Sequence, residues 1–247
     1  MVRKLKKRKI VLPAVLALGL LGFLLRLIGR KTGGGAWLWA LALLSVLVCA
    51  LAVVTARGLK PRPGYAPNNR PSTAMLAELL AALLLLAAAV VQLITSRSLF
   101  RWPACIAAVA GALCLGGFTL RSLRRTVPSP YLYMGLTVSL ICKLIPEFRA
   151  WSIDPHLSDY CFRLFAMIAV MCTSFHLGGF ALEKGKRRTT VFFCIAGIFF
   201  CAVSLADGGW AGVLSYLAYL LFLCAVLWSV MAPPRRRRRP KPQPPVE

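Results

Sequence analysis

Charged side chains with spacings suited to chemistry concentrate in residues 143–163, within a chain that is otherwise apolar or basic. This stretch holds three of the seven acidic residues and one of the two histidines. Lys143 and Glu147 are four residues apart, which on a helix places both side chains on one face. Asp159 and Arg163 have the same spacing. The sequence therefore predicts a polar network from two neighbouring helices, with these candidate ligand-binding residues: Lys143, Glu147, Asp154, His156, Asp159 and Arg163.

Two interpretations of this network remain open. The pairs can tie down the connection between the two helices and lower the desolvation cost of their charges, which is a structural role. Alternatively, they can line a polar cleft between the fifth and sixth helices, which is a binding role. The sequence favours the structural role.

A catalytic interpretation would use Asp154, His156 and Asp159 for metal binding or acid–base chemistry. Asp154 is followed by Pro155, and this pair is typical of a helix start, with a capping carboxylate before a residue that lacks an N–H. One histidine with two carboxylates also lacks a recognisable ligand motif such as HExxH. We therefore expect no enzyme activity and no catalytic residue.

A second possible metal or haem site is Cys172 with His176, four residues apart in an apolar run. Apolar packing is the favoured interpretation, and we expect neither a metal nor another cofactor. The nine cysteines lie in or beside apolar runs, which is typical of small packing residues rather than of a disulfide framework.

The composition indicates which elements hold these residues. Hydrophobic residues make up 59% of the 247, against about 45–50% in soluble domains. Apolar runs of roughly 20 residues, the length needed to cross a bilayer, recur along the chain. The sequence thus predicts an all-α, polytopic membrane protein with eight helices, at about 10–28, 36–56, 74–95, 103–120, 131–145, 155–182, 191–206 and 210–231.

Basic residues between the apolar runs predict the orientation. They concentrate in the connections that would share a side with the N-terminus, and short cytoplasmic loops are rich in Lys and Arg. Both termini are therefore expected in the cytoplasm, as a basic segment at 1–9 and a disordered, proline-rich tail at 232–247. No small-residue cleavage site follows the first apolar run, so it is expected to stay as a helix, with removal as a signal peptide the open alternative.

Charges at membrane depth mark candidate functional positions. Arg26, Lys143, Arg163 and Asp207 are expected in the outer ends of their helices, within about two turns of the interface. Glu78 is expected near the cytoplasmic end instead. Because the midplane holds only weak polar groups such as serine and threonine, ion-driven transport is disfavoured.

The favoured function is that of a non-enzymatic accessory or scaffold component, or a lipid-facing component, of a membrane assembly. The alternative is a carrier or receptor for a small neutral or anionic solute that enters between the fifth and sixth helices from outside. The simple charge pattern suits a bacterial cytoplasmic membrane.

The expected partners are the lipid bilayer and, for an assembly component, another membrane protein. The net charge of +24 would suggest nucleic acid in a soluble protein, but here it is explained by lipid-facing loops, and nucleic acid is unlikely. Contact with anionic lipid headgroups is assigned to the basic tail: Arg235, Arg236, Arg237, Arg238 and Arg239.

Overall fold

The structure is a computed structural model that describes residues 2–32, 35–59, 72–95, 102–124, 129–151, 157–182, 184–207 and 209–231. The side chains of residues 2–9, 150–151 and 157–159 lie outside this description. The described part is all-α and contains eight helices and no strand, as predicted. They are α1 (Val2–Thr32), α2 (Gly35–Arg57), α3 (Ser72–Thr95), α4 (Trp102–Leu123), α5 (Pro130–Trp151), α6 (Leu157–Ala181), α7 (Arg187–Ser204) and α8 (Trp210–Val230).

Each of these eight helices is long and apolar enough to cross a membrane. The apolar segments range from 18 residues in α7 to 24 in α3. At 1.5 Å per residue these lengths match the hydrocarbon thickness of a bilayer, about 30 Å. The predicted eight-helix membrane architecture is confirmed.

Several helix boundaries differ from the sequence-based prediction; α7, for example, begins at Arg187 rather than at residue 191. Helix α5 was expected to end at Ile145, but it continues through Pro146 to Trp151. Neighbouring helices and local adjustments compensate for the hydrogen bond that proline removes, so membrane helices tolerate it. Helix α1 begins at Val2, so the first basic residues continue the backbone of the first apolar run. The predicted helix start at Asp154 and Pro155 lies outside the described residues.

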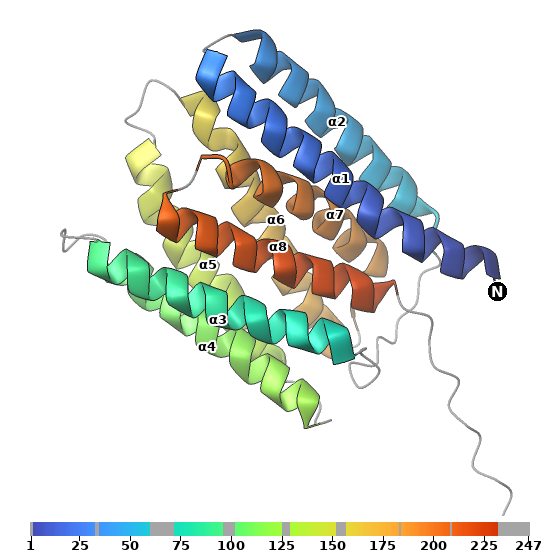
Figure 1. The fold of residues 1–247 in the computed structure, drawn as a ribbon. Coiled ribbons are helices and arrows are strands. Elements are labelled where there is room, and N and C mark those ends of the chain that lie inside the picture. The colour runs from blue at the N-terminus through green and yellow to red at the C-terminus, as the bar shows by residue number, and fades with distance from the viewer. Residues whose placement is uncertain are drawn as a thin grey trace, which may run out of the picture.

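Helices α3 to α8 form a closed sequence of neighbours, to which the hairpin of α1 and α2 is added (Figure 1). Each of these six helices packs on the next in the chain, and α8 returns to pack on α3. The α1–α2 hairpin packs mainly on α7. Helices α3 and α4 lie on the opposite side of the bundle from this hairpin (Figure 1).

Helix α7 is the central helix of the fold. It contacts α1, α2, α6 and α8, and its residues 194–204 are buried without interruption. Gly197 allows two neighbours to approach at one level, because a Cβ there would lie 2.6 Å from Leu223 on α8 and 3.1 Å from Ala169 on α6. Over residues 194–204, α7 is therefore covered by neighbouring helices and has no surface left for lipid.

Glycines on α1 allow the same close approach from the hairpin. A Cβ on Gly22 would lie 2.8 Å from side-chain atoms of both Phe199 and Val203 of α7. One turn earlier, a Cβ on Gly19 would lie 3.0 Å from the Cβ of Ala202. Small residues bring membrane helices together in this way, because lipid tails provide no hydrophobic force for association.

Arginines in the first turn of α7 bind the carboxyl ends of two neighbouring helices. Arg187 donates from Nε and Nη2 to the carbonyl oxygen of Val230, at 3.1 and 2.8 Å. Arg188 donates from Nε to the carbonyl oxygen of Leu59, just after α2, at 2.9 Å. A cation at a helix C-terminus satisfies free carbonyl groups and interacts favourably with the helix dipole.

Candidate polar site at one end of the bundle

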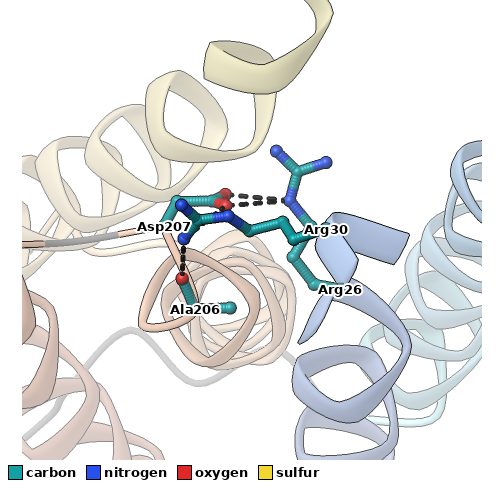
Figure 2. Close-up of polar contacts among 4 residues, drawn as sticks. All are labelled: Arg26, Arg30, Ala206 and Asp207. Carbon is teal, nitrogen blue, oxygen red and sulfur yellow. Dashed lines mark hydrogen bonds and ion pairs between the residues drawn. The ribbon is translucent and has the colours of Figure 1, made fainter. Parts of the chain in front are cut away.

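Charged residues from distant parts of the chain meet at the end of the bundle that holds the α7–α8 turn, here called the Asp207 end. Arg26, in the last two turns of α1, donates from Nε to both carboxylate oxygens of Asp207 at 3.0 Å (Figure 2). Their side chains are only 6% and 8% exposed. Because the carboxylate neutralises the guanidinium, this ion pair lowers the cost of burying both groups between helices.

Arg30 strengthens this contact one helical turn further along α1. Its Nη1 donates to the carbonyl oxygen of Ala206 at 2.6 Å and lies 4.0 Å from Oδ1 of Asp207 (Figure 2). The backbone here tightens into a turn, in which the N–H of Asp207 bonds to the carbonyl of Ser204. The two arginines of α1 thereby fix the α7–α8 turn through both a side chain and a carbonyl group.

Lys143 forms a second buried contact, between α5 and α8. Its side chain is 6% exposed, and its Nζ donates to Oγ of Ser215 at 3.2 Å. The hydroxyl of Ser215 donates in turn to the carbonyl of Ala211, 2.9 Å away. The ammonium also lies 5.6 Å from the ring centroid of Tyr219, within cation–π range. Lys143 therefore joins helices that are not consecutive in the chain.

Glu147 and Arg163 complete a cluster that we call the Lys143 cluster: Lys143, Glu147, Arg163, Ser215, Tyr216 and Tyr219. Glu147 interacts electrostatically with Lys143 and with both tyrosines. Arg163 interacts electrostatically with Tyr216 and lies 5.7 Å from the ring centroid of Tyr160. Helices α5, α6 and α8 thus contribute charged or hydroxyl groups to one cluster, with α6 and α8 contributing from near their starts and α5 from near its end.

The structure describes three of the six predicted ligand-binding residues with their side chains. Lys143, Glu147 and Arg163 all belong to the cluster at the Asp207 end. Asp154 and His156 lie outside the described residues, and only the backbone of Asp159 is described, within α6. The arginines assigned to lipid contact, Arg235–Arg239, also lie outside the described part. Ligand and lipid binding by these residues remain predictions.

The sequence analysis missed the pairing of Arg26 with Asp207. Their common depth was the available signal, because both residues were expected near the same interface. The order of the helices along the chain could not predict the pairing, because 181 residues separate Arg26 from Asp207. The pairing depends on the packing of α1 on α7. The sequence also did not single out Tyr216 and Tyr219, because only the structure shows that the side chain of Lys143 on α5 extends to α8.

No metal-binding group of three or more histidine, cysteine or acidic residues occurs among the described side chains. The ring of His176 stacks on Phe193 with centroids 5.8 Å apart and also meets Phe175 edge-on at 5.8 Å. These aromatic contacts fit the interpretation of His176 as a packing residue.

Comparison of the chain with models of protein families, with curated proteins and with solved structures finds no match. The classification therefore follows from the helices themselves. The chain is a multi-pass membrane protein.

Proposed function

We propose that this membrane protein is a non-enzymatic accessory or scaffold component of a membrane assembly. The supporting observation is that the buried charged side chains contact other helices of the same chain. Arg26 with Asp207 joins α1 to the α7–α8 turn, and Lys143 with Ser215 joins α5 to α8. These side chains connect helices within the chain, which is what a rigid, non-catalytic component requires.

The proposed setting is a bacterial cytoplasmic membrane with both termini in the cytoplasm. The concentration of basic residues at 1–9 and 232–247 supports this orientation. In this orientation the Asp207 end faces outward, and Arg235–Arg239 contact anionic lipid at the inner surface, with about 1 kcal/mol of attraction per basic residue near the surface.

Native mass spectrometry of the gently solubilised protein tests the accessory function. The expected result is a second membrane polypeptide at fixed stoichiometry, beyond the 27.0 kDa of the chain itself. Isolation of the protein from its own membrane as a single chain, under conditions that preserve other membrane complexes, would contradict the proposal.

A second candidate function is a carrier or receptor for a small solute. The observation that favours it is Arg163, whose Nε is buried and has no hydrogen-bond partner. A buried donor that no acceptor satisfies is costly, and a ligand can provide the acceptor. Arg163→Ala and Asp159→Ala are then expected to weaken retention of a bound small molecule while the melting temperature stays unchanged. Unfolding of both variants would instead indicate a structural role.

A further inference from the structure

The Lys143 cluster contains a buried hydrogen-bond donor that has no acceptor among the described groups. An arginine has five N–H donors and a lysine ammonium has three. Nε of Arg163 has no acceptor, although the atom is buried. Lys143 hydrogen-bonds to the hydroxyls of Ser215 and Tyr219, and the Ser215 hydroxyl already donates to the backbone of its own helix, so both acceptors are neutral groups. A group rich in acceptor oxygens would complete this arrangement.

The charges of the cluster indicate the sign of such a group. Its described side chains contribute two cations, Lys143 and Arg163, and one carboxylate, Glu147. In a poorly solvated site an excess cation is destabilising unless an anion lies next to it.

The position of Arg163 indicates how an anion would reach the cluster. It lies in the second turn of α6, which begins at Leu157, and its side chain is only partly buried. The guanidinium is therefore close to the end of the bundle, where phosphate groups of lipids and solutes in water are both found. Its planar fork matches the two oxygens of a phosphate or carboxylate group.

We propose that Arg163, together with Lys143 and the hydroxyl of Tyr216, binds a phosphate or carboxylate anion at the Asp207 end. This inference deepens the carrier or receptor function and rests on it, and it narrows the solute to an anion. The source is either a free anion or the headgroup of an anionic lipid, since both present the same oxygens.

The test measures binding of three probes to the purified full-length protein. Phosphatidylglycerol, diacylglycerol and inorganic phosphate are added separately, and bound lipid or phosphate is counted by native mass spectrometry and calorimetry. Arg163→Gln is expected to lower the affinity for the anionic probe by about tenfold or more, as loss of one charge-assisted hydrogen bond predicts. Arg163→Lys should give an intermediate loss, because it keeps the charge but not the planar fork.

Arg30→Gln is the matched control, since it removes one positive charge at the same end from a side chain that is 56% exposed. It is expected to change the affinity by less than about twofold. Binding of phosphate supports a free anion, and selective binding of phosphatidylglycerol supports a lipid headgroup. If the melting temperature of Arg163→Gln falls, the anion affinity of Arg163→Lys is compared with that of the unchanged protein instead.

Three results would overturn the anion inference. The first is that neither anionic probe binds better than diacylglycerol, which has no phosphate group. The second is that Arg163→Gln and Arg30→Gln weaken binding equally, and the third is that Arg163→Gln has no effect. If Arg163→Gln instead abolishes binding of the uncharged diacylglycerol, the anion inference fails while the carrier or receptor function stands.

Discussion

Nε of Arg26 and the carboxylate of Asp207 lie 3.0 Å apart in a buried ion pair, although 181 residues separate them in the chain. This ion pair joins the first helix to the turn that follows the central helix. Because the α1–α2 hairpin packs mainly on α7, the pair also fixes the hairpin at one end, while Arg188 and Leu59 fix it at the other.

Asp207→Asn is expected to destabilise the fold by about 3 kcal/mol or more, because it leaves the charge of Arg26 buried without its carboxylate. The measurement is the free energy of unfolding in a denaturant titration of the protein in detergent. Arg26→Met combined with Asp207→Asn should recover much of the loss, since no buried charge then remains unpaired. Equal destabilisation in the single and double variants would show that the pair does not couple α1 to the turn.

The sequence was sufficient to predict the helices, because each apolar run is about one bilayer thickness long and basic or proline-rich connections separate the runs. It was not sufficient to predict which helices are neighbours. Runs that are apolar on every side give no indication of the face that meets another helix, so the contacts of α7 with α1 and of α8 with α3 appear only in three dimensions.

The same limitation applies to the candidate site. The spacing of Lys143 and Glu147 on one helix was visible in the sequence, and so was the depth of Arg163. The acceptor for Lys143 was not, because Ser215 lies 72 residues further along and is one of several serines in apolar runs. The path of α5 through Pro146 was also misjudged, since the expectation followed helices in water rather than helices in lipid.

Ser215→Ala is expected to lower the free energy of unfolding by about 1–3 kcal/mol, because it removes the acceptor from a lysine that is almost fully buried. Thermal unfolding followed by tryptophan fluorescence provides the measurement. Ser45→Ala is the control, as the hydroxyl of Ser45 donates to the carbonyl of Ala42 in its own helix. If both variants melt at the same temperature, the contact between Lys143 and Ser215 contributes nothing to stability.

Gly22→Ala is expected to destabilise the fold by about 1–3 kcal/mol through overpacking, because the added Cβ would lie 2.8 Å from Phe199 and Val203. Gly22→Leu should separate the α1–α2 hairpin from α7 and make the hairpin sensitive to protease. Gly212→Ala in α8 is the matched control, since nothing lies within 4 Å of its added Cβ. That substitution should leave stability unchanged or raise it by up to about 1 kcal/mol through helix propensity. Equal effects at the two glycines would show that close packing of α1 on α7 is unimportant.

The orientation of the bundle leads to a prediction about both of its ends. With the basic segments in the cytoplasm, green fluorescent protein fused after Glu247 should fluoresce in a bacterial host, and alkaline phosphatase fused there should be inactive. Alkaline phosphatase fused after Gly209, in the α7–α8 connection, should be active, because an odd number of crossings precedes it. Trp102 and Trp210, at the starts of α4 and α8, are 52% and 85% exposed, which suits aromatic rings at the headgroup level on that side. The reverse pattern of reporter activity would place the Asp207 end in the cytoplasm, and the anion that Arg163 meets would then be a cytoplasmic one.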